Sequence, residues 1–245
     1  MSALVFDDVG LPADGSVHEV RSLDLRVSPS VHPLETAQAE AIARNWEAEL
    51  AANPALFNGP LILQREIRYR QGHLEAEGHV AGFATFLWWR RQPELSGACH
   101  LFAYPVLVGS DGALIAVEMA PHTANPGQVY FAAGSLDLSD IVDGRCDIEG
   151  NMRREVLEET GLDLRAAEPD PVLYASYRSR KMTLLRLFHF RETADELVER
   201  INAFARRCDE PEITRAVAIR DGDPEAHRYG LAMLPILGWY FSQRA

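Results

Sequence analysis

The order of hydrophobic and polar positions divides the chain into two stretches with different patterns. Residues 17–27 alternate as a strand does, and Pro33 opens a predicted amphipathic helix that runs to about Ala52. Two strand-like segments, 61–70 and 73–80, follow a Pro-containing break. We therefore predict that residues 1–97 form an N-terminal α+β extension.

From about Ala98, shorter strand and helix patterns alternate to the end of the chain. The predicted strands are 101–108, 113–120, 128–133, 171–179, 182–190 and 213–219. The predicted helices are about 147–160, 194–207 and 231–243. Alternation of this kind predicts an α/β fold with helices on both sides of a mixed sheet, in a second domain that spans residues 98–245.

Composition limits the classes of partner. With 47% hydrophobic and 24% charged residues the chain is typical of a globular protein, and its formal charge of −12 argues against a non-specific nucleic-acid surface. The longest apolar stretch, Leu231–Phe241, contains Pro235 and Gly238 and is too short to span a bilayer. We expect neither a nucleic acid nor a membrane as partner.

Three cysteines without metal-type spacing suit free thiols in a reducing compartment. Residues 1–10 lack both a basic segment and an apolar segment of the kind that begins a secretory signal. We therefore expect a cytoplasmic protein.

The candidate chemistry lies in the string Arg154 to Leu162, REVLEETGL. Glu155, Glu158 and Glu159 stand at i, i+3 and i+4, which places three carboxylates on one side of the predicted helix. Such like charges repel unless cations neutralise them, and Mg²⁺ or Mn²⁺ prefers oxygen ligands of this kind. Arg154 can orient Glu158 one turn away. A solvated acidic helix face is the alternative interpretation of the glutamates alone.

Residues 154–162 resemble the second half of the Nudix hydrolase signature, Arg-Glu-aliphatic-x-Glu-Glu-x-Gly-aliphatic, at every specified position. The resemblance implies a Nudix-type α/β/α sandwich, and it implies Glu155, Glu158 and Glu159 as metal ligands with Arg154 as the residue that orients one of them. The implied activity is metal-dependent cleavage of the diphosphate linkage of a nucleoside diphosphate derivative. The alternative is a Nudix-fold sensor or interaction domain that binds a nucleotide and cleaves it weakly or not at all.

The first half of that signature is not matched. Cys146 stands where the family has glutamate, and Asp140 stands where it has glycine. Residues 133–137 are similar to the Gly-Gly-x-x-Glu strand end of the family if about six residues are inserted after them, and loops tolerate such insertions. We predict that Asp137 or Asp147 supplies the missing outer carboxylate.

A later acidic segment, 209–212, precedes the predicted strand 213–219. Related enzymes often place a metal ligand or general base on such a loop, so we select Glu212 as a catalytic candidate. Glu159, Glu210 and Glu212 are all candidates for the group that accepts a proton from water. A plain polar loop is the alternative.

Other charged and aromatic groups have two interpretations each. Arg178, Arg180, Lys181 and Arg186 surround a predicted hairpin turn that could contact a phosphate or simply be solvated. Two adjacent tryptophans before two arginines, Trp88 to Arg91, could stack a base or pack between domains. His122 lies in a loop and could contact substrate or solvent.

The substrate is suggested only by a loose similarity. Residues from Trp46 to Phe83 resemble the N-terminal region of a Nudix subgroup that acts on UDP-glucose and UDP-galactose. Residues 125–131 are faintly similar to coenzyme A pyrophosphatases. An NDP-sugar is the favoured substrate, dinucleotides and ADP-ribose stay open, and the chain could be a monomer or a homodimer.

Overall fold

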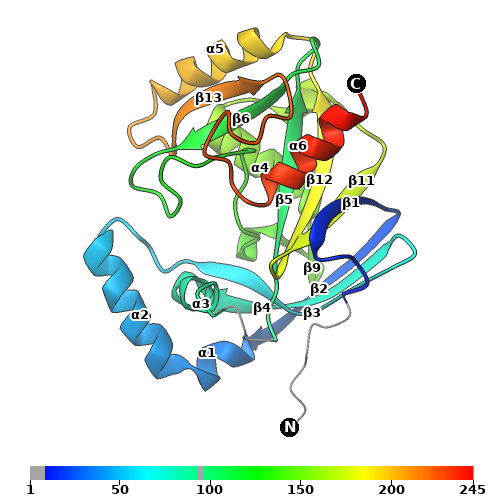
Figure 1. The fold of residues 1–245 in the computed structure, drawn as a ribbon. Coiled ribbons are helices and arrows are strands. Elements are labelled where there is room, and N and C mark those ends of the chain that lie inside the picture. Colours follow the sequence, from blue (N-terminus) through cyan, green and yellow to red (C-terminus); the bar gives the residue numbers. More distant parts are fainter. Residues whose placement is uncertain (1–8, 93–96, 245) are drawn as a thin grey trace.

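Two mixed sheets organise the computed structural model, which describes residues 9–92 and 97–244 (Figure 1). Within these residues the larger sheet has eight strands: β1 (Asp14–Val20), β5 (His100–Val108), β6 (Leu114–Met119), β7 (Val129–Tyr130), β10 (Glu168–Pro169), β11 (Leu173–Arg178), β12 (Lys181–His189) and β13 (Ile213–Ile219). The smaller sheet has five: β2 (Ser22–Val31), β3 (Pro60–Arg70), β4 (His73–Gly82), β8 (Ile141–Val142) and β9 (Arg145–Cys146).

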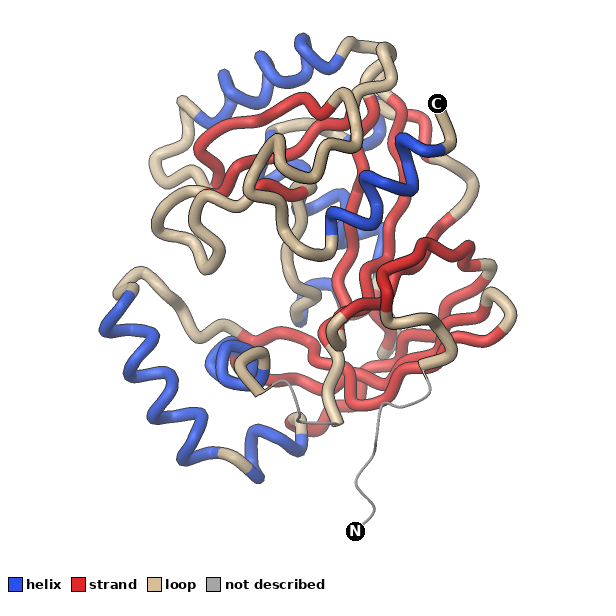
Figure 2. Tube along the Cα trace, viewed as in Figure 1, coloured by secondary structure: helices blue, strands red, loops and turns tan. Residues whose placement is uncertain are grey.

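The helices lie on the faces and ends of these sheets, as the tube in Figure 2 shows. They are α1 (Pro33–Ala37), α2 (Ala39–Ala52), α3 (Phe83–Trp89), α4 (Ile148–Thr160), α5 (Ala194–Ala205) and α6 (Met233–Ser242), with short 3₁₀ turns η1 (Leu138–Asp140) and η2 (Leu164–Ala166).

The larger sheet is covered by helices on both faces. Its strand order is β1-β11-β12-β5-β6-β13, with β12 parallel to β5 and the other neighbours on this path antiparallel. Leu101 and Leu107 of β5 pack with α4 and α5, whereas Phe102 and Tyr104 face the cluster that contains α6. All nine residues of β5 are buried, as expected of a central strand with both faces covered. The predicted α/β sandwich with a mixed sheet is confirmed.

The smaller sheet shares its core with the larger one. Leu25, Ile62 and Leu74 of the smaller sheet belong to the same buried cluster as Leu101 of β5. A bridge between Gln64 and Cys99 also connects the end of the extension to β5. One face of the smaller sheet thus packs against the second domain, and α2 and α3 cover the other face.

Each side of the predicted domain boundary at residue 97 contributes strands to the sheet formed mainly by the other side. β1 pairs with β11 in the larger sheet, while β9 pairs with β2 in the smaller sheet. The division into 1–97 and 98–245 stays a prediction, because the shared core gives no point at which the two parts separate without exposing apolar surface.

Two predicted elements are broken in the structure. The strand predicted at 17–27 divides at Arg21, where the backbone N–H groups of Arg21 and Ser22 both point to the Gly72 carbonyl oxygen, and its halves join different sheets. The helix predicted from Pro33 divides at Gln38, whose φ of −124° is not helical. The predicted helices at 147–160, 194–207 and 231–243 are present with ends within a few residues.

No helix among the described residues is long and apolar enough to cross a membrane. Cys99, Cys146 and Cys208 are free thiols, as predicted. Residues 1–8, which carry most of the segment used to argue against a secretory signal, lie outside the described residues.

Candidate active site

Helix α4 carries the candidate carboxylates and is fixed at both ends. The Asp147 side chain accepts a hydrogen bond from the Gly150 backbone N–H (2.9 Å), and Gly161 ends the helix with a φ of 68°. Its apolar side, Ile148 and Val156 among others, is buried in the main core. The N-cap and the stop agree with the sequence prediction, and the helix is held rigidly behind its carboxylates.

The three glutamates differ in exposure. Glu155 and Glu159 are 8% and 7% exposed, whereas the Glu158 side chain is 58% exposed. The backbone of Gly134 lies against Glu155, because a Cβ at Gly134 would come within 2.4 Å of a Glu155 carboxylate oxygen. Glycine at this position therefore lets the strand end approach the carboxylate.

Arg154 connects the acids of this site. Its Nη1 atom lies 2.8 Å from Glu155 Oε1 and 3.2 Å from Glu158 Oε2. Its Nη2 atom lies 2.9 Å from Asp140 Oδ2 and 3.2 Å from Asp140 Oδ1. The arginine thus holds two of the candidate ligands and is itself anchored by a carboxylate from outside the helix.

That anchoring residue, Asp140, was not selected from the sequence. It is 4% exposed, and its Oδ2 also accepts bonds from Asn151 Nδ2 (3.0 Å) and the Asp137 backbone N–H (3.0 Å). Asp137 is 3.7 Å from Arg154 and caps η1, while Asp147 caps α4. The sequence feature that could have pointed to Asp140 is that an aspartate stands where the Nudix signature has glycine.

Burial and mutual repulsion raise the pKa of two of these carboxyls. The pKa of Glu155 is raised to about 7, mainly by burial; Arg154 opposes this rise, and the charges of Glu158, Asp140 and Glu212 add to it. Burial raises the pKa of Glu159 well above its usual value; Glu155 and Glu212 add to this, and a backbone hydrogen bond from Ala133 opposes them. The site therefore carries negative charge that its own residues balance only in part.

A divalent cation fits this charge. Within the described residues, no three Asp, Glu, His or Cys side chains are already arranged to hold a metal ion, since Arg154 contacts Glu155 and Glu158. Glu159 Oε2, however, is buried without a hydrogen-bond partner. A buried carboxylate oxygen without a partner is costly, and a hard cation is the counterion that such oxygens accept.

The late acidic loop lies beside these glutamates. Glu212 is exposed and interacts electrostatically with both Glu155 and Glu159, and its carbonyl oxygen accepts from the Ala120 N–H (2.9 Å). Glu210 and Glu212 line a cavity of about 150 Å³ together with the three glutamates of α4. The structure thus brings Glu155, Glu158, Glu159 and Glu212 to one place, whereas Asp147 caps the far end of α4.

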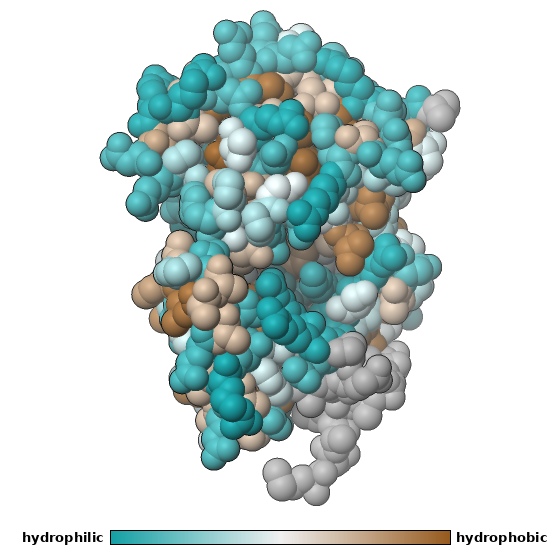
Figure 3. All heavy atoms as spheres, turned by 60° about the vertical axis from the view of Figure 1, so that its left-hand side comes forward, coloured by the Kyte–Doolittle hydropathy of each residue, from teal (hydrophilic) through white to brown (hydrophobic). Residues whose placement is uncertain are grey.

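A second cavity, of about 300 Å³, begins at Glu155, Glu159 and Glu212 and extends to the smaller sheet's side of the molecule. Figure 3 shows a hollowed, mostly hydrophilic surface between the parts that carry α5 and α2. The cavity contains aromatic rings that could stack on a base or sugar and polar groups at its far end: Phe83, Phe86, Phe102, Tyr104, Tyr130, His100, Arg90 and Lys181.

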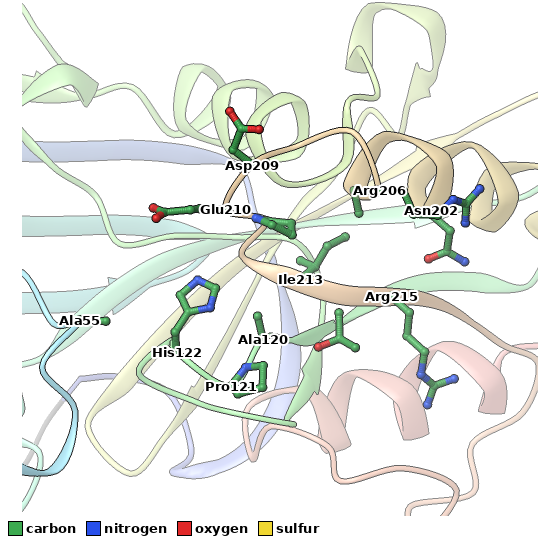
Figure 4. A pocket seen from close by; sticks show the side chains of 13 residues that line it. Ala55, Ala120, Pro121, His122, Asn202, Arg206, Asp209, Glu210, Ile213 and Arg215 are labelled. Atoms are coloured by element: carbon green, nitrogen blue, oxygen red, sulfur yellow. The ribbon is translucent and has the colours of Figure 1, made fainter.

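The largest cavity, of about 900 Å³, lies on the other side of the late loop (Figure 4). His122, Glu210 and Arg215 line it, and Arg215 pairs with Glu118 at 2.7 Å. The glutamates of α4 do not line this cavity. Asp209 and Glu210 of the late loop line it, so this cavity lies beside the loop and apart from the glutamates of α4.

The remaining residues selected from the sequence lie in different surroundings, and only some of them face a cavity. Arg186 pairs with Glu149 (3.4 Å), and Arg180 lies 4.3 Å from the Trp89 ring. Trp88 and Trp89 are buried in α3, a helix that the sequence prediction missed, so packing is their role. Of the predicted cationic cluster at the hairpin, Lys181 lines the 300 Å³ cavity.

Comparisons with known proteins found similar solved structures at low sequence identity. No family model and no curated protein matches the sequence. The structure is similar to a MutT protein from Methanosarcina mazei, with 12% identity and a TM-score of 0.39 over 59% of this chain and 94% of that chain. It is also similar to a Nudix hydrolase from Nitrosomonas europaea, with 21% identity and a TM-score of 0.36 over 58% and 88% of the two chains.

A third similar structure is a bifunctional NMN adenylyltransferase/ADP ribose pyrophosphatase from Francisella tularensis, complexed with AMP and a manganese ion. It is 14% identical, with a TM-score of 0.38 over 60% of this chain and 42% of that chain. The similar structures named here are thus Nudix hydrolases and related pyrophosphatases at low sequence identity. The likeness concerns the fold over about 60% of the chain.

Proposed function

We propose that this protein is a metal-dependent pyrophosphohydrolase that cleaves the diphosphate linkage of a nucleoside diphosphate derivative. One observation carries the proposal: Glu159 has a buried carboxylate oxygen with no partner, beside Glu155 and at the mouth of a cavity large enough for part of a nucleotide. Phosphoryl transfer to water requires concentrated negative charge that holds cations against the phosphate, and this arrangement supplies it.

The residues of α4 have distinct proposed roles. Glu155, Glu158 and Glu159 would hold Mg²⁺ or Mn²⁺, and Arg154 would position Glu155 and Glu158 while Asp140 holds Arg154. When bound, the cation supplies charge neutralisation at the diphosphate and activation of a water molecule. Arg154 contacts Glu155 Oε1 and Glu158 Oε2, which leaves the second oxygen of each carboxylate for a cation.

A carboxylate must also accept the proton that the attacking water loses. Glu212 is our first candidate because it is exposed, approaches the buried glutamates and stands on a loop outside α4. Glu159 and Glu210 are the other candidates. Exposure to solvent lets Glu212 release the proton after each turnover, which a buried Glu159 cannot do as readily.

An NDP-sugar is the substrate that we favour. The cavity of about 300 Å³ joins the carboxylates to Phe83 and Phe86 of α3, so the N-terminal extension forms part of its wall. A wall of this kind can recognise what lies beyond the diphosphate, since pockets are common where two structural units meet.

The test is a screen with Mg²⁺ or Mn²⁺ against UDP-sugars, ADP-ribose, dinucleotides, coenzyme A and nucleoside triphosphates, with products identified by mass. We expect a nucleoside monophosphate and a phosphorylated second product, and no turnover in EDTA. Release of pyrophosphate from triphosphates alone would reject the diphosphate-linked substrate. Ligand-induced thermal stabilisation without cleavage would favour the sensor alternative.

A further inference from the structure

The far end of the 300 Å³ cavity contains two cationic side chains from distant parts of the chain. Arg90 follows helix α3, and Lys181 begins strand β12. Lys181 pairs in parallel register with His100 of β5, which lines the same cavity, so the two side chains share a face of the sheet. Lys181 is also the only lysine in the chain.

Neither cation has an anionic partner among the residues that the structure describes. Within residues 9–92 and 97–244, no ion pair joins Arg90 or Lys181 to a carboxylate. Glu49 attracts Arg90, but its ion pair is with Arg91 at 2.6 Å. Two cations at one end of a cavity without a carboxylate paired to either are unfavourable until an anion binds between them.

The electrostatic environment agrees with this geometry. Burial lowers the pKa of Lys181, and Arg90 and Arg180 lower it further. Burial also lowers the pKa of Arg90. His100 interacts with both cations: its pKa falls to about 3 through burial and their charges, so the imidazole is neutral. Its Nε2 atom lies 3.1 Å from Ser135 Oγ.

These cations lie at the opposite end of the cavity from the metal-binding carboxylates. His100, Phe102 and Tyr104 line the cavity at alternate positions of β5, and Tyr104 lies within the electrostatic reach of Glu159. The four steps of strand from His100 to Tyr104 span roughly 13 Å at about 3.3 Å per residue. An anion held at the cationic end would therefore be separate from a phosphate held at Glu159.

We infer that Arg90 and Lys181 bind a second anionic group, a carboxylate or a phosphate, on the part of the substrate that lies beyond the scissile diphosphate. This inference rests on the proposed function for its substrate class. It narrows the favoured NDP-sugar to an acidic one, or to a nucleotide with an additional phosphate. Phe86, whose ring is 4.5 Å from His100, would pack against the group that carries this charge.

The experiment compares substrates that differ by the second anion alone. UDP-glucuronate is paired with UDP-glucose, and the 2′-phosphate of ADP-ribose is paired with ADP-ribose. In wild-type protein we expect the anionic member of one pair to have a kcat/KM higher by about ten- to a hundredfold, mostly through KM, since a charge-assisted contact has about this effect. The pair that shows the preference identifies the anion as carboxylate or phosphate.

Lys181→Gln and Arg90→Gln should reduce the ratio of kcat/KM between the anionic and the neutral substrate to near unity. The kcat/KM for the neutral substrate should stay within about threefold of wild type, and Lys181→Arg should retain the preference for the anionic substrate. Arg207→Gln is the matched control, because Arg207 is exposed and has no side-chain hydrogen bond or ion pair within the described residues. Thermal shifts in metal-free buffer with the same four ligands measure binding without catalysis.

The two proposals fail in different ways. Hydrolysis of both members of each pair at equal efficiency, or an equal loss for both members in the variants, overturns the anion site and leaves the pyrophosphohydrolase standing. No hydrolysis, together with a thermal preference for the anionic ligand that Lys181→Gln removes, overturns the enzyme and keeps the site. Neither hydrolysis nor stabilisation by any of the four ligands rejects both.

Discussion

The two ends of the 300 Å³ cavity are built in opposite ways. At the carboxylate end, Glu155 and Glu159 come from one helix, and Arg154 of the same helix contacts Glu155 at 2.8 Å. At the cationic end, Arg90 follows helix α3 beside the smaller sheet, and Lys181 begins strand β12 of the larger sheet. Among the described residues, neither forms an ion pair with a carboxylate.

The comparison teaches how a protein keeps unlike charges apart inside one cavity. The carboxylate end balances part of its charge internally through Arg154, which Asp140 anchors, so it can fold before a cation arrives. Among the described residues the cationic end has no such internal balance. In our proposal, binding at the first end serves chemistry, while binding at the second selects the substrate.

The largest effect should follow from removing the buried carboxylate. Glu159→Gln is expected to lower turnover by about a hundredfold or more, because one metal-binding charge is lost. Glu149→Gln on the same helix is the matched control; Glu149 pairs with Arg186 and should leave turnover within a few-fold of wild type. Turnover and the thermal shift on adding Mg²⁺ are measured for both.

For Glu159→Gln we also expect the metal-free protein to gain thermal stability at pH 8, since a buried charge with a raised pKa has been removed. An active variant that Mg²⁺ still stabilises would show that the carboxylate end does not hold the metal.

A smaller effect separates Asp140 from the two aspartates that the sequence suggested. Asp140→Asn should raise the Mg²⁺ concentration required for half-maximal activity by about ten- to a hundredfold, because Arg154 loses its buried anchor. Asp147→Ala should instead cost about 1 kcal/mol of stability, through loss of the α4 cap, and leave the metal requirement unchanged. Magnesium titrations and chemical denaturation measure the two quantities.

The reverse result, a raised metal requirement in Asp147→Ala or Asp137→Ala and none in Asp140→Asn, would restore the sequence prediction for the outer carboxylate.

The smallest expected effect is on stability, and it concerns helix α1, which holds the start of helix α3 in place before Arg90. His32 caps α1 by accepting from the Leu34 N–H, and Glu35 of α1 accepts from Gly82 N (2.6 Å) and Thr85 Oγ1 (2.7 Å) at the start of α3. The pKa of His32 is lowered to about 4, mainly by burial and in part by the positive charges of His79 and Arg65. Protonation would remove the cap and loosen the helix that precedes Arg90.

The sign follows from the lowered pKa: the stability that neutral His32 contributes is complete above about pH 6.5 and is lost as pH falls toward 4. His32→Asn keeps a cap without titrating, so unfolding free energy should fall less steeply over this range, by up to about 1.4 kcal/mol per pH unit. His100, with its pKa of about 3, maintains part of the slope in the variant. Identical slopes in both proteins would contradict the assignment.

The sequence by itself determined what depends on neighbours along the chain. The spacing of Glu155, Glu158 and Glu159, the Asp147 cap and the Gly161 stop all act within about one helical turn, so local periodicity predicts them. The alternating strands from residue 98 similarly predicted the sheet and its helices on both faces.

Only the tertiary structure decided which distant residues meet. Asp140 reaches Arg154 because η1 packs beside α4, and Lys181 and Arg90 reach one cavity because β12 lies next to β5 and α3 follows the smaller sheet. Periodicity tells which side of an element is buried, but it does not tell which elements pack together. A buried aspartate that binds an arginine and an exposed one that caps a turn have the same pattern in sequence, since the difference between them is the partner that folding brings near.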